Sequence, residues 1–534
     1  EHGIQFIRSK VYGVEEVDGT GNLSLKYAAE NGELRTDDFD MVVLSVGLKP
    51  KPKAIELAEK LGIELNEYGF CKTHSFSPVN TSEKGIYVCG AFQGPKDIPE
   101  TVMQASGAAA SSSALLSEVR GELVAKKEFP PETVVNGEPP RIGVFVCHCG
   151  INIGGIVNVQ DVKNYAASLP NVVFVDENLY TCSQDTQENI VNTIKEHKLN
   201  RVVVAACTPR THEPLFQETL REAGLNRFLF EMANIRDQDS WVHSSEPEKA
   251  TEKAKDLVRM AVAKAALLEP VEEIKVKLSQ QALVVGGGVS GMVAALTLAD
   301  QGYKTYLVEK NDRLGGQALH LKRTWKGEDI QEYLKDLISK INDHPKIEVL
   351  LNSRVVDVEG FVGNFNSTIR NGNSERTINH GVAILATGAE SLEPDEYLYG
   401  KSDRVFRWHE LDEAIEKNPQ MVENARCAVF IQCVGSREPD RPYCSKICCT
   451  AAIQKALELK ELNPDMDVFV LYRDLRTYGR REELYTEARQ KGIIFIRYTL
   501  ENKPVVEEIT TDDGRQVLKV TVIDHVLQMP VALE

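Results

Sequence analysis

The sequence predicts an α/β protein with several parallel-sheet domains. Three observations support this fold class. From residue 141 onwards, short apolar strands alternate with amphipathic helices. A glycine-rich turn joins one of these strands to a helix. The chain has 534 residues, 42% hydrophobic and 26% charged, which is enough for several ordinary globular cores.

The charge and the cysteines exclude several classes of protein. A formal net charge of −17 argues against general nucleic-acid binding, because a phosphate backbone needs a positive surface. The uncharged stretch Ala282–Ala299 is interrupted by glycines and predicts a strand, a turn and a helix rather than a membrane span. Eleven clustered cysteines, an odd number, indicate metal or redox chemistry in a reducing cytoplasm rather than a disulfide framework.

The two ends of the chain resemble each other. GIQFIR at Gly3–Arg8 matches GIIFIR at Gly492–Arg497, and Val14–Val17 matches Val506–Ile509. A tandem duplication with a period of about 490 residues explains these matches. The alternative is two β-rich segments without a common origin. We expect the tail of one repeat, continuing through Asp40–Gly47, followed by most of a second repeat.

A small cysteine-containing domain follows a linker. Residues 126–140 (KKEFPPETVVNGEPP) are rich in Pro, Glu and Lys and lack periodicity. The alternating pattern that begins at Arg141 predicts a small parallel sheet. Strands are expected in RIGVFVCHCG and over 171–176 and 201–206, and helices over 159–169, 186–197 and 213–223, with a long charged helix over 248–268.

The glycine-rich turn predicts a dinucleotide site. A strand at Ala282–Val285 runs into Gly286-Gly287-Gly288-Val289-Ser290-Gly291, a helix is expected over 292–301, and a second strand, Lys304–Val308, ends at Glu309. The glycines allow a tight turn that brings a pyrophosphate to the helix N-terminus, and the acidic residue can accept a ribose hydroxyl. The alternative is a glycine-rich packing turn.

The residues after this motif distinguish the dinucleotide. Glu309 is followed by Lys310 and then by Gly315-Gly316-Gln317, and an ATG sequence ends at Thr387-Gly388. This resembles the two-dinucleotide flavoproteins that include thioredoxin and glutathione reductases, in which such residues mark FAD. The NAD(P) domain of that family needs a second glycine-rich turn. After the expected strand Cys427–Gln432 this turn is missing, so we expect the nicotinamide site to be absent or altered.

A compact cysteine set follows that strand. Four cysteines lie within 17 residues in the spacing C-x10-C-x3-C-C: Cys433, Cys444, Cys448 and Cys449. Four thiolates are the usual ligands of a 4Fe–4S cluster, although the spacing differs from the common ferredoxin run. Zinc is an alternative, and inert or disulfide-bonded cysteines are another.

A second, dispersed cysteine set lies in the small domain: Cys147, Cys149, Cys182 and Cys207. Most of these residues are at or after the ends of expected parallel strands, which converge on one sheet edge. They could therefore hold a second cluster, or be free buried thiols. We expect His148 to point away from them, His212 and His243 to be structural or surface residues, and Cys71, Cys89 and Cys427 to pack as small apolar residues.

Several longer motifs resemble the family of A-type heterodisulfide reductase subunits. They are VCHCGINIGG at Val146–Gly155, AACTPRTHEPLF at Ala205–Phe216, EMANIRDQDSWVH at Glu231–His243, the Ile431–Cys449 segment and QGPKDIPETVMQASGAA at Gln93–Ala109. The resemblance implies an FAD-containing iron–sulfur component of an anaerobic electron-transfer complex, with two 4Fe–4S clusters and an ability to bifurcate electrons. It implies B- and C-type subunits, hydrogenase or dehydrogenase input subunits and ferredoxin as partners, and a homodimer within the assembly.

Two features depart from the family. No C-x2-C-x2-C-x3-C run occurs in the chain. Related flavoproteins also have Gly-Asp in the returning FAD segment, whereas Gly90-Ala91 stands here, and it belongs to the first repeat. Either the two repeat copies exchange segments when the chain folds, or each flavin site needs sequence that is missing here. The alternatives for function are an NAD(P)H-dependent disulfide oxidoreductase of the thioredoxin reductase type and a non-redox scaffold.

These inferences give one set of expected domains and sites. No catalytic acid, base or nucleophile is assigned, and the FAD residues are those named above, from Gly90 to Gly388. The domains are a tail of a first flavoprotein unit (1–125), a linker (126–140), a small cluster-binding α/β domain (141–245), a connecting helix (246–276), a Rossmann-like FAD domain (277–390), a degenerate nicotinamide-type domain with a cluster (391–500) and the start of a second FAD-return segment (501–534).

Overall fold

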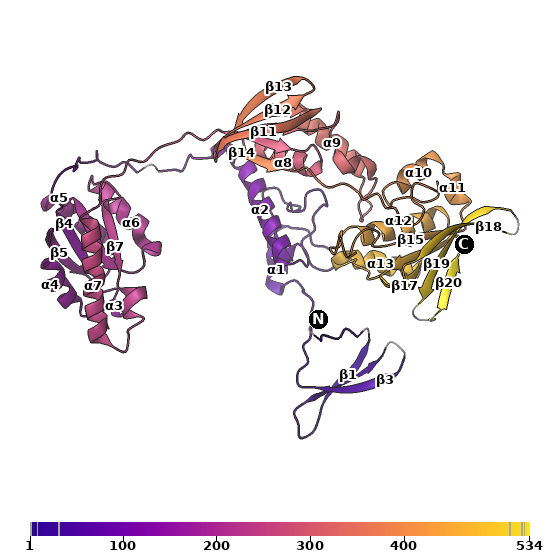
Figure 1. Ribbon diagram of the computed structural model, residues 1–534, viewed down its shortest axis with the longest axis horizontal. Coiled ribbons are helices and arrows are strands. Elements are labelled where there is room, and N and C mark those ends of the chain that lie inside the picture. Colours follow the sequence, from indigo (N-terminus) through magenta and orange to yellow (C-terminus); the bar gives the residue numbers. More distant parts are fainter. Residues whose placement is uncertain are drawn as a thin grey trace. The chain divides into compact units, whose positions relative to one another are not determined.

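The computed structural model describes residues 3–7, 9–29, 32–125, 127–511, 514–524, 527 and 529–534. The chain forms two compact units (Figure 1). Unit 1 contains Glu1–Arg120 and Leu278–Glu534, and unit 2 contains Gly121–Lys277. None of the described helices is both long and apolar enough to cross a bilayer.

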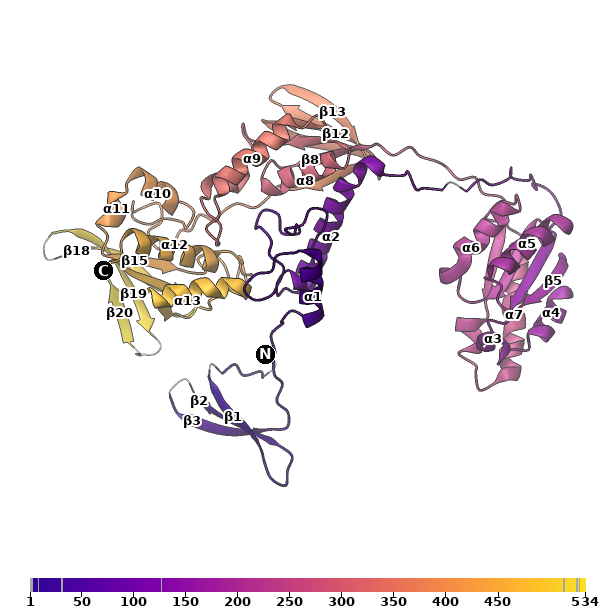
Figure 2. The ribbon, with the colours of Figure 1, turned by 180° about the vertical axis from the view of Figure 1, so that it is seen from behind.

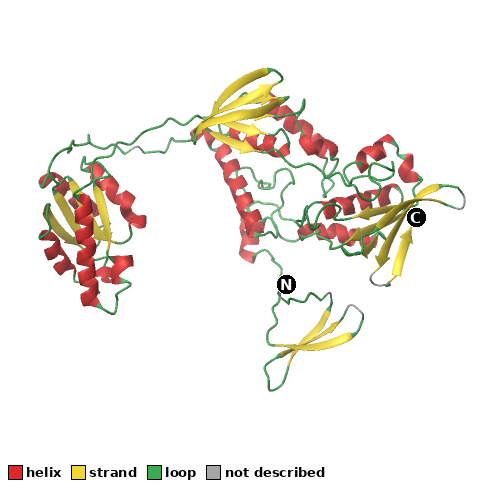
Figure 3. Ribbon diagram, in the orientation of Figure 1, coloured by secondary structure: helices red, strands yellow, loops and turns green. Residues whose placement is uncertain are grey.

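Unit 2 is a four-stranded parallel sheet in the order β5-β4-β6-β7. Every residue of β4 and β6 is buried, because helices cover both sheet faces (Figure 3). α4 and α7 pack on one face, and α5 and α6 on the other. The elements are β4 (Ile142–Cys147), α3 (Ile151–Gly154), α4 (Val159–Ala167), β5 (Val172–Asn178), α5 (Gln184–Glu196), β6 (Arg201–Ala206), α6 (Pro209–Glu222), β7 (Phe230–Asn234), η3 (Arg236–Ser240, a π-helical turn) and α7 (Pro247–Ala265).

The helix expected as a connection between domains is α7. One face of it is lined by alanines and valines, including Ala250, Ala254 and Val258, which are fully buried in the core of unit 2. Small side chains allow close approach to the sheet, so α7 is an integral layer of this unit. The other expected strands and helices of unit 2 are present, with ends shifted by a few residues.

The first sheet of unit 1 is parallel in the order β10-β9-β8-β14. Its strands are β8 (Gln281–Val285), β9 (Lys304–Val308), β10 (Ile347–Leu350) and β14 (Val382–Leu385). α8 (Val289–Asp300) and α9 (Ile330–Asp343) pack on it, and η4 (Gly316–His320) lies between them in sequence. An antiparallel sheet of β11 (Ser353–Phe361), β12 (Asn364–Asn371) and β13 (Ser374–His380) precedes β14 in sequence.

The second parallel sheet of unit 1 has three strands in the order β15-β16-β17. An antiparallel meander, β18-β19-β20, packs on it. The elements are α10 (Leu411–Lys417), α11 (Gln420–Glu423), β15 (Cys427–Ile431), α12 (Cys448–Leu462), β16 (Asp467–Tyr472), η5 (Gly479–Arg481), α13 (Glu482–Gln490), β17 (Ile494–Arg497), β18 (Val505–Thr510), β19 (Gln516–Asp524) and β20 (Met529–Leu533).

The N-terminal segment forms a second meander and a helix that packs on α8. β1 (Val11–Glu16), β2 (Leu23–Ala28) and β3 (Leu34–Phe39) form an antiparallel sheet of three consecutive strands, as β18-β19-β20 do. After α1 (Pro52–Leu61) and η1 (Gly90–Phe92), helix α2 (Ile98–Leu115) packs against α8 (Figure 2). η2 (Ser117–Val119) follows, and the Ser117 hydroxyl donates to the Asp300 carbonyl at 3.1 Å. The N-terminal segment therefore packs through α2 and η2 on helix α8.

Candidate cofactor-binding sites

The glycine-rich turn is held by close backbone contacts. Gly286 has a φ of 113°, and a Cβ there would overlap the Ala386 carbonyl at the end of β14. A Cβ on Gly291 would overlap the Gly286 carbonyl, so this glycine lets the first turn of α8 lie directly on the loop. Both glycines are therefore required by packing within the protein itself.

Gly288 is different, because it faces open space. It is the N-cap of α8, with a φ of −75°, and among the described residues no heavy atom lies within 4 Å of the position of a Cβ there. No side chain in the described part of the chain caps this helix start. Free N–H groups beside a space that lacks a side chain form a cradle for an anion, and this cradle fits a dinucleotide pyrophosphate.

Glu309 reaches the same loop from the end of β9. Its side chain is buried, and Oε2 accepts a hydrogen bond from the Gly287 amide at 2.6 Å, while Oε1 accepts from the Asn311 amide at 2.9 Å. The carboxylate therefore lies at the turn itself. In dinucleotide sites, a carboxylate at this place accepts a hydrogen bond from a ribose hydroxyl.

The other predicted FAD residues converge on this edge of the sheet. The Gly315 amide donates to the Gly287 carbonyl at 2.9 Å, and Gly316 lies against Gly288. Gln317 donates to the Ala389 carbonyl at 3.4 Å, and Lys310 lies 3.6 Å from Glu390. Val289 and Ser290 begin α8, and Thr387 and Gly388 follow β14 and are exposed.

Gly90 is held within its own segment. Its amide donates to Gln104 Oε1 at 2.8 Å, and its carbonyl accepts from Lys96 Nζ at 2.8 Å. The ammonium of Lys96 also donates to Gln93 Oε1 and to the Gly94 carbonyl, so this lysine fastens the loop before α2. The link of Gly90 to the dinucleotide turn runs through α2, which packs on α8.

The compact cysteines gather between β15 and α12. Cys433 follows β15 with a left-handed φ of 63° and is buried, and Cys448 and Cys449 begin α12. The hydrogen bond between the two adjacent thiols, with burial, raises the pKa of Cys448, and the Cys433 and Cys444 thiols raise it further. The same hydrogen bond lowers the pKa of Cys449. The other three thiols of the set are thus within electrostatic range of Cys448.

The loop that carries Cys444 is bonded to α2. The Lys446 amide donates to Cys444 Sγ at 3.4 Å, and the Lys446 ammonium lies 3.1 Å from Glu100 Oε1 in the first turn of α2. Lys446 itself has a left-handed φ of 68°. Strained backbone of this kind is common where a loop is shaped for function.

The dispersed cysteines meet at the carboxyl edge of the sheet in unit 2. Cys147 Sγ accepts hydrogen bonds from the Cys149 amide at 3.2 Å and the Thr181 amide at 3.4 Å. Burial raises the pKa of Cys182, and the Cys147 and Cys149 thiols raise it further. Burial also raises the pKa of Cys207, and the same two thiols add to that shift. The four cysteines expected to converge at the strand ends therefore lie near one another.

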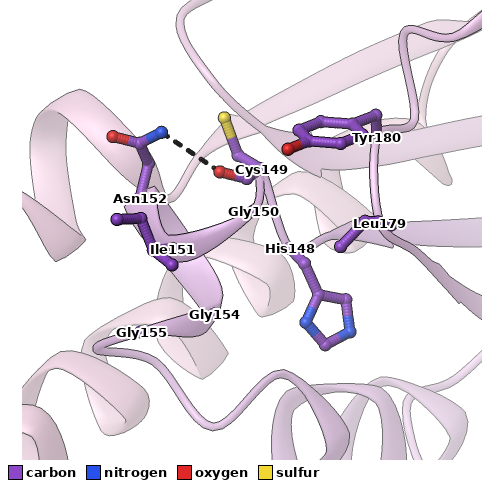
Figure 4. Close-up of a pocket in the computed structure, with 9 residues that line it drawn as sticks. All are labelled: His148, Cys149, Gly150, Ile151, Asn152, Gly154, Gly155, Leu179 and Tyr180. Carbon is purple, nitrogen blue, oxygen red and sulfur yellow. Dashed lines mark hydrogen bonds between the residues drawn. The ribbon is translucent and has the colours of Figure 1, made fainter.

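His148 points away from this set. Its Nε2 lies 3.2 Å from Glu177 Oε2, and Figure 4 shows the imidazole on the opposite side of the chain from the Cys149 sulfur. An open pocket of about 470 Å³ is lined there by His148, Cys149, Gly150, Ile151, Asn152, Gly154, Gly155, Leu179 and Tyr180. The cysteine set therefore lies beside accessible surface.

Each cysteine set has the donor chemistry of an iron–sulfur cluster. Four thiolates are the usual ligands of a 4Fe–4S cluster. Among the described residues, no three His, Cys, Asp or Glu side chains are already arranged as metal ligands. Two sets of four soft thiols, each with backbone amides directed at a sulfur, fit such a cluster.

The remaining cysteines and the other two histidines predicted above differ in their burial and contacts. Cys71 is buried and Cys427 is partly buried, but Cys89 is exposed, so the expectation that Cys89 packs in a core is wrong. Cys89 precedes the η1 turn, and that turn places Gly90 rather than Cys89 in the interior. His212 is half-buried in α6, and His243 lies 3.0 Å from Lys253 Nζ.

Two arginines that contact cysteines and one buried carboxylate were not singled out from the sequence. Arg236 Nη1 lies 3.5 Å from Cys149 Sγ, and Arg437 Nη1 lies 3.8 Å from Cys433 Sγ. Asp239 in η3 is fully buried. Both arginines occur within the motifs quoted above. For Arg437, the sequence does offer a signal, because this residue follows Cys433 by only four positions in CVGSR.

One family model matches most of unit 1. The family model described as pyridine nucleotide-disulphide oxidoreductase matches residues 1–110 and 280–430, and both ranges lie in unit 1. The thioredoxin reductase of Lactococcus lactis is similar at 19% identity over 47% of this chain and 74% of that chain, with a TM-score of 0.32.

Relatives with closer sequences are named as components of heterodisulfide reductases. The A-type subunit of the H(2):CoB-CoM heterodisulfide,ferredoxin reductase of Methanothermobacter thermautotrophicus is 38% identical over 70% of this chain and 72% of its own length. One A-type iron-sulfur subunit of the CoB--CoM heterodisulfide reductase of Methanopyrus kandleri is 38% identical over 67% and 69%. With a flavoprotein-type dinucleotide turn in the same chain as two sets of four cysteines, this protein belongs to the oxidoreductase family of A-type heterodisulfide reductase subunits.

Proposed function

We propose that the chain is the FAD- and iron–sulfur-containing electron-transfer component of a heterodisulfide-reductase-like complex. One observation carries this proposal. The loop of the compact cysteine set is bonded through Lys446 to Glu100 in α2, and α2 packs on the helix that begins at the dinucleotide turn. The two proposed cofactor sites of unit 1 are thus linked through helix α2.

The protein's own residues would position the cofactors. The open cradle at Gly288 and the carboxylate of Glu309 would hold the adenosine half of FAD, with Gly315, Gly316, Thr387 and Gly388 beside it. The compact set and the dispersed set would each hold one 4Fe–4S cluster. When bound, FAD supplies paired or single electron transfer and each cluster supplies single electron transfer.

Electron input through a nicotinamide in this chain is disfavoured. β15 is followed by Gln432 and then Cys433-Val434-Gly435, without the glycine-rich turn that a second dinucleotide needs. We therefore infer that electrons enter from partner proteins, such as B- and C-type subunits, a hydrogenase or dehydrogenase component, or ferredoxin. Bifurcation at the flavin, a cytoplasmic location and assembly as a homodimer are parts of the same proposal.

The first test measures iron, acid-labile sulfide and FAD in the full chain purified without oxygen. We expect about eight irons, an equal amount of sulfide and about one FAD per chain. Replacing Cys433 and Cys444 by serine should remove about four irons, and replacing Cys147 and Cys149 should remove the other four. Cys89→Ser is the control, because this thiol is exposed and outside both sets.

Each deviation has a distinct meaning. FAD with negligible iron would contradict the proposal and favour a disulfide oxidoreductase, and the absence of both cofactors would leave a scaffold. Four irons that persist in the Cys147 and Cys149 variant would show that the dispersed set holds no cluster.

A further inference from the structure

Each cysteine set has one arginine against the sulfur of one cysteine. In unit 2, Arg236 Nη1 is 3.5 Å from Cys149 Sγ, and in unit 1, Arg437 Nη1 is 3.8 Å from Cys433 Sγ. Both cysteines have left-handed backbones, with φ of 46° and 63°. The left-handed backbone and the guanidinium contact thus occur at the same cysteine in both sets.

Arg236 is fixed by its surroundings. It begins the π-helical turn η3, and its side chain is 19% exposed. The guanidinium lies 4.7 Å from the ring of Trp241, and its Nε is 3.4 Å from Asp237 Oδ2. An aromatic face and a carboxylate hold the charge in place, and π-helical turns of this kind are frequent at functional sites.

Arg437 is fixed in a similar way by different elements. Its Nη2 lies 2.5 Å from Asp474 Oδ2, and its side chain is 21% exposed. Its backbone has a φ of 60°, its amide donates to the Tyr443 carbonyl at 3.0 Å, and its carbonyl accepts from Arg473 Nη1 at 2.8 Å. This strained loop therefore has two backbone hydrogen bonds that hold the guanidinium beside Cys433.

We propose that Arg236 and Arg437 set the reduction potentials of the two clusters, each raising the potential of the cluster that it touches. The inference rests on the proposed function, because it needs a cluster at each set. Reduction adds one negative charge to a cluster, and a fixed cation at a ligand sulfur stabilises the reduced form more than the oxidised form. Hydrogen bonds to ligand sulfurs act in the same direction.

The two arginines differ in how strongly they are neutralised. Asp474 is hydrogen-bonded to Arg437 at 2.5 Å, whereas the nearest carboxylate oxygen to Arg236 is at 3.4 Å. The net positive field at the sulfur is therefore larger from Arg236. We expect the loss of Arg236 to lower the potential of its cluster more than the loss of Arg437 lowers the potential of the other.

The test is a redox titration of the full chain followed by electron paramagnetic resonance. In Arg236→Gln, the iron content should be unchanged and the midpoint potential of one cluster should shift to a more negative value. Arg236→Lys keeps the charge without the forked geometry and should shift it less. Arg259→Gln is the matched control, because this arginine lies on α7 beside Asp256 and away from sulfur.

A change of the acidic partner gives a shift in the opposite direction. Asp237→Asn removes the charge that offsets Arg236, so the same midpoint potential should become more positive even if Arg236→Gln fails to fold. Arg437→Gln should shift only the other cluster, with Arg489→Gln as its control. Iron-loaded chains whose potentials are unchanged in Arg236→Gln and Asp237→Asn would overturn the inference, whereas a wild-type chain without iron would overturn the proposed function.

Discussion

Replacing Gly288 with alanine is expected to abolish stable FAD binding while leaving the fold intact. The position already has an extended backbone that alanine adopts freely, and among the described residues nothing lies within 4 Å of the new methyl group. The methyl group instead fills the space at the N-terminus of α8 that a pyrophosphate would occupy. We expect FAD affinity to fall at least tenfold, which is about 1.4 kcal/mol or more.

The stability of the apoprotein separates this effect from simple unfolding. Alanine is a poorer N-cap than glycine, but it also reduces the entropy of the unfolded chain, so the change should stay within about 1 kcal/mol. Gly291→Ala is the contrasting variant, since its methyl group would overlap the Gly286 carbonyl and should destabilise the fold by about 1–3 kcal/mol. Gly13→Ala in β1 is the control for a glycine in open space elsewhere.

Two measurements decide this prediction. Flavin absorbance per chain after removal and re-addition of FAD gives the binding, and thermal unfolding of the apoprotein gives the stability. If Gly288→Ala binds FAD like the wild type, the cradle at the start of α8 is not the pyrophosphate site. If the Gly288→Ala apoprotein unfolds at a temperature as low as that of Gly291→Ala, the space beside Gly288 is not open.

The parts of the fold that were predictable from sequence depend on local patterns. The turn at Gly286–Gly291 is recognisable because strand, glycines, helix and acid follow one another within a short stretch. The dispersed cysteines were grouped by one rule of topology, that the carboxyl ends of parallel strands share an edge. Both inferences need only the order of elements along the chain.

The missed features depend on packing between distant elements. Arg236 reaches Cys149 because a π-helical turn after β7 contacts α3, which follows β4, and no residue spacing signals such a turn. Glu100 reaches Lys446 across 346 residues of sequence, because α2 packs against the later part of unit 1. The prediction that Cys89 is packed in the interior was also wrong, because the exposure of this thiol depends on the η1 turn, which buries Gly90 instead.

Asp239 is expected to make unit 2 less stable as the pH rises. Its side chain is fully buried, and in the described part of the chain neither carboxylate oxygen has a hydrogen-bond partner. Burial raises the pKa of this carboxyl from 3.8 to about 6, and the nearby Lys253 and His243 oppose the shift without cancelling it. An unpaired buried carboxylate is costly, whereas its protonated form is neutral.

The sign follows from proton binding. Between its unfolded and folded pKa values, the folded state holds more protons at Asp239 than the unfolded state, so stability is lost as the pH rises through about 6. The whole effect is about 3 kcal/mol, of which roughly half appears above pH 5. In Asp239→Asn this dependence should vanish, and the variant should gain stability relative to the wild type as the pH is raised from 5 to 8.

Urea unfolding followed by the fluorescence of Trp241 measures this difference. Trp241 lies in unit 2, so replacing Trp325 and Trp408 with phenylalanine in both proteins confines the signal to that unit. Asp256→Asn on the same unit is the control, because this carboxylate is exposed and pairs with Arg259. A difference between wild type and Asp239→Asn that stays constant from pH 5 to pH 8 would mean that Asp239 is ionised throughout that range. In that case η3 must open enough for water to reach the carboxylate, and the turn that holds Arg236 against Cys149 would be a mobile element.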